Sequence, residues 1–219
     1  KNEDGVVENT DKMFASVGVG DKEYKLLAKV SDFTKDGWKL EALRNENATL
    51  VPGGKLEKDA FLTNKDGRKI GVIIRNLSDK NQKVSDCIVT KLSFSKEMFD
   101  GQITLPGSLG FDSTEKELKA AGFKKDADGI YTYTSKKIKD DTIKAAMADG
   151  ESVSEITLER AVDESSTSTG NAAANTSVST AAGSATTTAS DSSSAEQPSA
   201  TAETTFTNNS NSASDAAEE

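Results

Sequence analysis

Histidine is absent from this sequence of 219 residues, and cysteine occurs only once, as Cys87. Histidine is the commonest general base and metal ligand near neutral pH, so its absence excludes Ser-His-Asp and Cys-His catalysis and removes most transition-metal sites. A single cysteine cannot form an internal disulfide. Cys87 begins an apolar stretch, which predicts a small core residue, with a reactive or oligomer-forming thiol as the alternative.

Long apolar runs and an excess of basic residues are missing too. No stretch of about 18 apolar residues occurs, so no helix is predicted to span a bilayer. The formal net charge is −9 at pH 7, whereas a general nucleic-acid binder needs a basic face. Nucleic acid is therefore not an expected partner.

The C-terminal 56 residues, 164–219, contain no Lys or Arg and consist mainly of Ser, Thr and Ala with seven acidic residues. Phe206 is their only aromatic residue. A segment so poor in apolar side chains cannot offset the entropy lost when its backbone is ordered. We therefore expect three parts: a flexible lead-in over 1–12, an α+β domain over 13–163, and a disordered acidic tail, rich in Ser, Thr and Ala, over 164–219.

Apolar residues recur at every second position in several short stretches, which predicts β-strands. Within 13–26, two short strands flank a tight turn at Gly20-Asp21. The pattern of 142–148 fits either a strand or an alanine-containing helix. Further strands are expected over 60–63, 70–77, 87–94, 103–105, 130–134 and 153–160.

Two short helices are predicted, and a glycine followed by a large aromatic residue ends each of them. The first covers 31–36 and precedes Gly37-Trp38. The second opens with a capping box over 114–117 and ends at Gly122-Phe123. A glycine in the left-handed conformation allows the chain to reverse at such a helix end, and the aromatic residue then folds under the helix.

These two helix ends lie in halves of similar plan. About three strands follow each helix, which we interpret as two degenerate strand-helix-three-strand repeats over 13–99 and 100–163. The repeats would form an antiparallel sheet with short helices on one face. Chance is the alternative explanation, because many helices end in glycine and an aromatic residue.

Several motifs of the domain carry a resemblance to known proteins. Ile103-Thr104-Leu105-Pro106-Gly107, the stretch from Gly110 to Leu118, and Gly122-Phe123 resemble the helix opening in small exported domains of the β-lactamase-inhibitor-protein type. Asn76-Leu77-Ser78 and Asp86-Cys87-Ile88-Val89 resemble uncharacterised lipoproteins of Gram-positive gut bacteria. The resemblance implies two repeats in a curved antiparallel sheet with helices on one side. Some members of that family hold a partner protein in the concave face, but no binding residue is carried over here.

Two loops contain residue types that are typical of sites. Asp126-Ala127-Asp128-Gly129 hints at a calcium loop, but Lys124 and Ser135 stand where an EF-hand loop needs acids, so a hairpin turn is favoured. Ser108 lies among glycines, but without the spacing of a nucleophile elbow and without a histidine. A serine hydrolase is therefore not expected.

Acidic and aromatic side chains offer further candidate sites. Acids in a first helical turn are expected from the helix dipole, so a glycosidase-like carboxylate pair is not favoured; the acids considered are Asp32, Asp36, Glu115 and Glu117. Trp38 is the only tryptophan, and its position after a helix-ending glycine favours packing under the helix over an exposed binding platform. Asn-x-Ser/Thr sequons begin at Asn47, Asn76, Asn175 and Asn208.

Together these features predict a non-enzymatic binding domain that is extracellular or at the cell surface. A chain that begins at Lys1 without methionine suits a protein whose signal peptide has been removed, so membrane attachment through a preceding lipid anchor is expected. The expected partner is an unknown extracellular protein or surface polymer, with no cofactor, metal or catalytic residue. A structural envelope lipoprotein without a ligand and a carboxylate-based hydrolase are the alternatives. A common groove formed by Trp38, Tyr131 and Tyr133 would favour binding, and burial of all three would favour the structural alternative.

Overall fold

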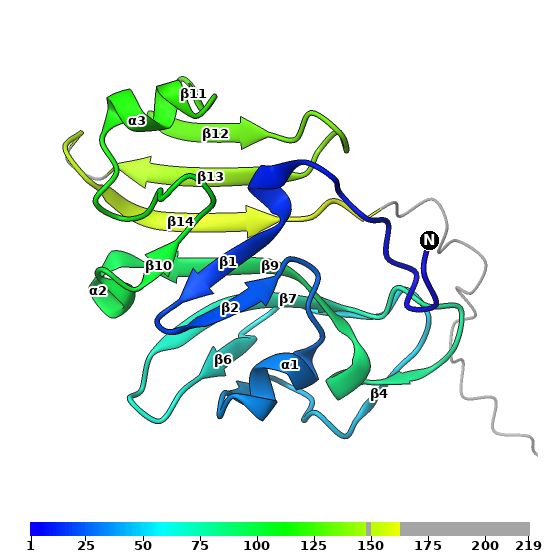
Figure 1. Cartoon of the computed structure of the whole chain (residues 1–219). Coiled ribbons are helices and arrows are strands. Elements are labelled where there is room, and N and C mark those ends of the chain that lie inside the picture. Colours follow the sequence, from blue (N-terminus) through cyan, green and yellow to red (C-terminus); the bar gives the residue numbers. More distant parts are fainter. Residues whose placement is uncertain (148–149, 163–219) are drawn as a thin grey trace, which may run out of the picture. The chain divides into compact units, whose positions relative to one another are not determined.

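The computed structural model describes residues 1–147 and 150–162. They form antiparallel sheets with a few short helices, which confirms the α+β class (Figure 1). The predicted tail, 164–219, lies outside the described residues.

A nine-stranded antiparallel sheet is the centre of the fold. Its strands follow the order β11-β12-β13-β14-β9-β7-β6-β3, and β5 pairs with β7 beside this path. The strands β4 and β8 form a separate pair. The bounds are β3 Lys39–Glu41, β4 Thr49–Leu50, β5 Lys55–Leu56, β6 Phe61–Thr63, β7 Lys69–Arg75, β8 Gln82–Lys83, β9 Ile88–Ser95, β11 Lys124–Lys125, β12 Ile130–Thr134, β13 Thr142–Met147 and β14 Val153–Glu159.

Period-two alternation explains why only one face of this sheet is apolar. On β7, β9 and β14, side chains such as Val72, Leu92 and Leu158 are buried, while their sequence neighbours are partly exposed. These three residues are cross-strand partners, so the buried side chains of adjacent strands stack into one continuous layer. The strand predicted over 70–77 is interior, since β7 pairs with β6 on one side and β9 on the other.

A second layer covers the apolar face. It contains a three-stranded sheet of order β10-β1-β2, in front of the large sheet in Figure 1. The turn at Gly20 joins β1 and β2 as predicted, and Gly20 has a φ of 62°. Short helices complete this layer. The bounds are η1 Lys12–Phe14, β1 Ser16–Val19, β2 Lys22–Lys25, α1 Val30–Lys35, η2 Val84–Asp86, α2 Lys96–Phe99, β10 Ile103–Thr104 and α3 Glu115–Ala120.

The helix α1 ends in the predicted way. Gly37 has a φ of 92°, where a side chain would be strained. The Trp38 amide donates to the carbonyl of Phe33 at 3.2 Å, and the Gly37 amide to that of Thr34 at 3.1 Å. This Schellman pattern satisfies carbonyls at the helix end and brings the buried Trp38 back against the core.

The helix α3 ends in the same geometry. Gly122 has a φ of 101°, and the amides of Phe123 and Gly122 donate to the carbonyls of Leu118 and Lys119, each at 3.0 Å. The capping box predicted at its start is also present, because the Thr114 amide donates to the Glu117 carboxylate at 2.7 Å. Positive φ at both glycines is therefore confirmed.

The strand count in each half differs from the prediction of three strands after each helix. Five strands of the large sheet follow α1: β3, β6, β7 and β9 lie on its main path, and β5 pairs with β7 beside it. Four strands, β11, β12, β13 and β14, follow α3 on the same path. The two sets run in opposite order across the sheet and meet where β9 pairs with β14. The strands expected to begin each half, β1 and β10, instead pair with each other in the second layer.

The N-terminal segment differs from the expected flexible lead-in. Asn9 and Asp11 are buried, and their side chains bond to residues of the 135–141 loop. The lead-in looked like a frayed end because it is polar, but its polar groups are satisfied by distant partners that the sequence does not reveal. The ambiguous 142–148 stretch forms β13, since it pairs with β12 and β14 on both sides.

Candidate functional site

A groove of about 1540 Å³ lies between the N-terminal segment, the strand β2 with the loop that follows it, and the helix α1. Leu27, in that loop, has a φ of 73°, a conformation that is rare for a bulky side chain. The chain therefore turns sharply away at the end of β2, and this turn separates β2 from the start of α1.

Tyr24 contributes to one wall of the groove, and buried aromatic residues behind it hold it in place. Tyr24 stacks on Phe33 with ring centroids 4.2 Å apart, and its hydroxyl accepts from Trp38 Nε1 at 3.1 Å. The same hydroxyl donates to the Asp36 carboxylate at 2.9 Å. Burial and this bond to Asp36 raise the pKa of Tyr24.

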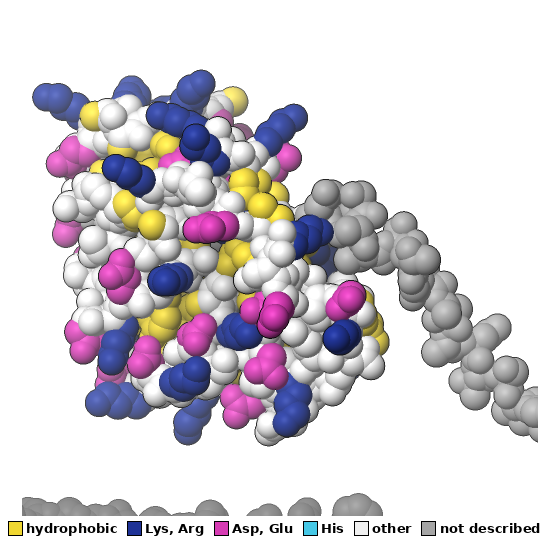
Figure 2. Space-filling model, turned by 45° about the vertical axis from the view of Figure 1, so that its right-hand side comes forward, with side chains coloured by type: hydrophobic (Ala, Val, Ile, Leu, Met, Phe, Trp, Pro, Cys, Tyr) yellow, Lys and Arg dark blue, Asp and Glu magenta, His cyan; other side chains and the backbone are white. Residues whose placement is uncertain are grey.

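Charged side chains of both signs line the rim. Lys29 Nζ lies 2.9 Å from Asp4 Oδ1 and so joins the loop after β2 to the N-terminal segment. The hydrogen bond to Asp4 raises the pKa of Lys29. On the face shown in Figure 2, acidic and basic side chains are interspersed, with Lys and Arg gathered along the upper edge. A mixed surface of this kind does not select for a strongly charged polymer.

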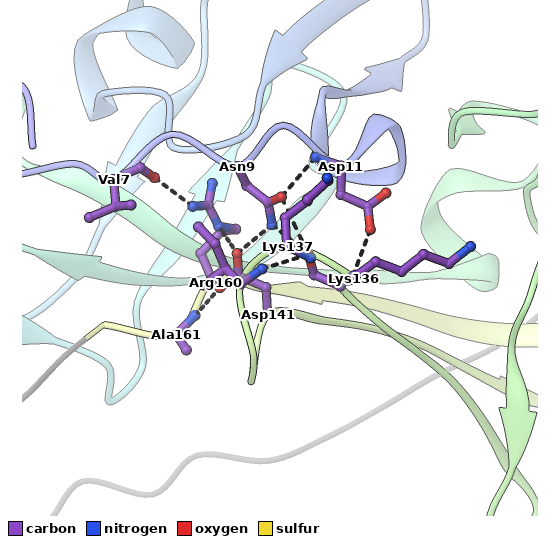
Figure 3. A network of polar contacts seen from close by, with 10 residues as sticks. Val7, Asn9, Asp11, Lys136, Lys137, Asp141, Arg160 and Ala161 are labelled. Atoms are coloured by element: carbon purple, nitrogen blue, oxygen red, sulfur yellow. Dashed lines mark hydrogen bonds and ion pairs between the residues drawn. The ribbon is translucent and has the colours of Figure 1, made fainter.

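Arg160, which contributes to the groove wall, forms a buried ion pair with Asp141 (Figure 3). Arg160, at the end of β14, pairs through Nε with the Asp141 carboxylate, and the two side chains are 7% and 0% exposed. Arg160 Nη2 also donates to the Val7 carbonyl at 2.8 Å. Asp141 accepts further bonds from Asn9 Nδ2 at 2.7 Å and from the Ala161 amide at 2.8 Å. Such partners are what a buried ion pair needs to offset its desolvation.

A second carboxylate, Asp11, continues this polar network. It accepts from the Tyr133 hydroxyl at 3.0 Å and from the amides of Lys136 and Met13 at 2.9 and 3.1 Å. Burial alone would raise the pKa of Asp11, but these hydrogen bonds outweigh it and hold the pKa below its usual value. The network thus fastens the N-terminal segment to the 135–141 loop and to the end of the last strand.

The two buried carboxylates do not face one cleft. Asp11 contributes to the groove wall, whereas Asp141 is enclosed and occupied by Arg160. A glycosidase needs one carboxyl group with a raised pKa opposite a second across a substrate site. The pKa of Asp11 is lowered, so Asp11 does not fit the role of the acid. Among the described residues, no group of three or more Cys, Asp or Glu is placed to hold a metal ion.

The three aromatic residues proposed for a common groove are all buried and do not form one. Trp38, Tyr131 and Tyr133 are 8%, 1% and 5% exposed. Trp38 packs on Phe99 and Tyr133 on Phe123, which places them in different parts of the core. Burial of Trp38, rather than exposure as a platform, is confirmed.

The acids suggested by the sequence are spread over two helices. Asp32 accepts from the Lys29 amide at the start of α1, and Glu117 caps α3. Glu115 pairs with Lys119 one turn further along α3. Asp36 is the exception, because it lies at the C-terminal end of α1 and not in a first turn; it accepts there from Tyr24.

The remaining candidates have structural surroundings. Cys87 is fully buried, and burial followed by the Asp86 charge raises the pKa of its thiol to about 11. Asp126 accepts from the amides of Asp128 and Ile130, as a hairpin turn requires. Ser108 is exposed in a turn with a φ of 61°.

Only one of the two sequons in the described part presents its asparagine to solvent. Asn47 is exposed, but Asn76 is fully buried and its Nδ2 donates to the carbonyls of Leu50 and Lys80. Asn76 therefore organises the turn after β7 and offers no acceptor for a glycan. The sequons at 175 and 208 lie outside the described residues.

The residues of the buried network were not identified from the sequence as a site. Arg160 carried the one available signal, because it stands on the apolar face of a predicted strand, and a charge there requires a buried partner. Asn9 and Asp141 are separated by 132 positions and have no local pattern that marks them.

No family model matches this chain, and neither does any curated protein or solved structure with which it was compared. Within the described ranges, 1–147 and 150–162, none of the helices has the length and apolar character required to cross a bilayer. Function is therefore argued from the surfaces of the domain.

Proposed function

We propose that this chain is a non-enzymatic binding domain that acts outside the cell, held at the surface by a lipid anchor. Its ligand, an extracellular protein or a surface polymer, would bind the outer face of the nine-stranded sheet. The observation that carries the proposal is a row of partly or fully exposed side chains that crosses seven strands in register. The row is Thr132, Lys144, Thr157, Ser93, Gly71, Phe61 and Glu41.

The centre of this row is unusually flat. Gly71 lacks a side chain, and a Cβ built there would lie 3.3 Å from the Ser93 Cβ. The hydroxyls of Ser93 and Thr157 lie 3.4 Å apart across neighbouring strands. Small side chains allow a partner to approach the sheet closely, and their hydroxyls supply hydrogen bonds to it.

Charged pairs flank the flat centre. Lys91 lies 3.6 Å from Glu159, and Lys69 Nζ lies 2.9 Å from Glu41 and over the ring of Phe61. Charges of both signs around a small polar centre suit specific recognition of a folded surface. Parts of this chain resemble exported domains of the β-lactamase-inhibitor-protein type, some of which hold a partner protein in the concave face of their sheet.

Internal duplication is part of this proposal. The two helix–glycine–aromatic ends and the mirrored sets of four strands are the features expected of two copies of one ancestral unit. A duplicated half would explain why the outer face extends over both halves with similar small and charged residues.

The test places a large side chain in the centre of the face. The full wild-type chain is first tested for binding to an array of extracellular proteins and cell-wall polymers. Thr157→Arg should abolish binding to every member of the array that the wild type binds. Ala120→Arg, on the exposed side of α3, is the control and should bind normally. Retention by both variants would contradict the outer face as the binding surface. Fractionation of the cells that produce the protein tests the surface location.

Burial of Trp38, Tyr131 and Tyr133 favours a second candidate, a structural envelope lipoprotein without a discrete ligand. This candidate predicts that the wild type retains no member of the array. It also predicts that removal of the protein alters the envelope while Thr157→Arg has no effect.

A further inference from the structure

The strand β2 has a free edge. It is the last strand in the order β10-β1-β2, and among the described residues no strand pairs with its other side. That edge borders the groove, whose wall includes the whole stretch from Glu23 to Lys29. A free edge offers unpaired backbone donors and acceptors to another extended chain.

The backbone groups at this edge belong to Glu23 and Lys25. The Leu26 amide donates to the Ala15 carbonyl at 3.3 Å, so Leu26 faces β1. Backbone groups of successive strand residues point to opposite sides, which means that Tyr24 also faces β1. Glu23 and Lys25 therefore direct their amides and carbonyls away from β1 and toward the groove.

The edge is held rigidly but is short. Inward packing of Tyr24 against Phe33, and its bond to Asp36, fix the strand on the core. The left-handed turn at Leu27 then directs the chain away, so only the four residues of β2 remain for pairing. Glu23 and Lys25 are both exposed and lie on one face of the strand, where each can meet a side chain of an added strand.

We propose that this edge binds the β2 edge of a second copy of this chain in an antiparallel, twofold-symmetric pair centred on Tyr24. In this register the outward groups of Glu23 meet those of Lys25 of the second copy, and the reverse pair forms by symmetry. Each of the two pairs exchanges two backbone hydrogen bonds, and each places a carboxylate opposite an ammonium group.

Charge selects this register from three that the backbone permits. If the twofold axis lay at Glu23 instead of Tyr24, the two copies of Glu23 would lie opposite each other. If it lay at Lys25, the two copies of Lys25 would do so. Like charges directly opposite each other destabilise a strand pair. In an antiparallel partner, this edge recognises a three-residue sequence that has an acid first and a base last. Glu23-Tyr24-Lys25 is itself such a sequence. Self-recognition follows from this complementarity.

Two short strands bury much less area than a stable dimer requires. We therefore expect a weak dimer, formed at high local concentration such as that of proteins crowded on a surface. Sedimentation velocity of the full chain over a concentration series should show self-association. Hydrogen exchange should show that the amides of Glu23 and Lys25 become protected as concentration rises, whereas that of Tyr24 is protected at every concentration.

Charge reversal tests the register directly. Lys25→Glu or Glu23→Lys changes both symmetry-related contacts from attractive to repulsive, so each should lower the association constant on the order of tenfold. An equimolar mixture of the two single variants should associate at least as well as the wild type, because an all-acidic edge then meets an all-basic one. The double variant should also recover.

Controls with the same change in net charge are available on other surfaces. Lys65→Glu, in the turn before β7, and Glu97→Lys, in α2, are exposed and should associate like the wild type. A monomer at all concentrations with unchanged exchange at Glu23 and Lys25 would overturn the proposal. So would association that both single reversals leave intact. Protection of the edge by a synthetic Glu-Tyr-Lys peptide without self-association would show that it takes a foreign segment instead.

Discussion

Replacement of Arg160 by methionine is the most incisive test of the buried network. Methionine has a comparable length and no charge, so Arg160→Met would leave Asp141, which is 0% exposed, with only the Asn9 and Ala161 donors. Removal of one partner from a buried ion pair typically costs about 3–5 kcal/mol, because the remaining charge stays desolvated. The Val7 carbonyl loses its donor as well, which adds to the cost.

The expected loss is therefore about 3–5 kcal/mol in the free energy of unfolding. For a domain of this size, that corresponds to a fall in Tm of roughly 6–20 °C. Urea unfolding followed by the fluorescence of Trp38, the single tryptophan, measures the free energy, and calorimetry measures Tm. Replacement of both partners, Arg160→Met with Asp141→Leu, should recover a large part of the loss, since no buried charge remains.

A surface pair between β9 and β14 provides the comparison. Lys91 lies 3.6 Å from Glu159 with its side chain 32% exposed, so Lys91→Met should cost less than about 1 kcal/mol. If Arg160→Met proved no more destabilising than Lys91→Met, the argument that the ion pair fastens both ends of the domain would be refuted.

Three further outcomes follow from local geometry. Gly122→Ala should destabilise the protein by about 1 kcal/mol or more in urea unfolding, and by more than Gly37→Ala does. Both glycines have positive φ, but a Cβ at position 122 would also lie 3.3 Å from the Tyr133 ring. Because the pKa of Asp11 is lowered in the folded state, its carboxylate stabilises the protein above the ordinary pKa of 3.8, and this stability is lost as pH falls through the lower folded pKa. The free energy of unfolding should therefore fall less between pH 6 and pH 2 in Asp11→Asn than in the wild type. Cys87, buried and with a pKa of about 11, should not react with a thiol reagent at pH 8 until the protein unfolds, and rapid labelling of the native protein would contradict this.

Local sequence patterns predicted the elements of this fold well. The strands at 70–77 and 130–134 and the two glycine-terminated helices were found because their signals are contained within a few residues. The strand at 142–147 was ambiguous alone, and only pairing with two neighbours decides it. Pairing across the sheet is a property of the whole chain and leaves no mark in a short window.

The sites were harder to predict for the same reason. Burial of Asn9 and Asp11 depends on partners more than 120 positions away, so a polar N-terminal segment resembled a frayed end. The edge of β2 required the strand order, because Glu23-Tyr24-Lys25 in isolation is an ordinary exposed strand. Arg160 was not identified as a site residue either, although the alternation places it on the apolar face of its strand.

The contact between Val7 and Arg160 has a consequence for protein engineering. The two residues are 153 positions apart in the sequence but lie at hydrogen-bonding distance, so the beginning and the end of the described domain are close together in space. A chain with adjacent entry and exit can be inserted into a surface loop of a host protein without forcing the loop apart. The same adjacency permits circular permutation, in which a short linker joins the two ends and new ends open in an exposed turn such as 64–67.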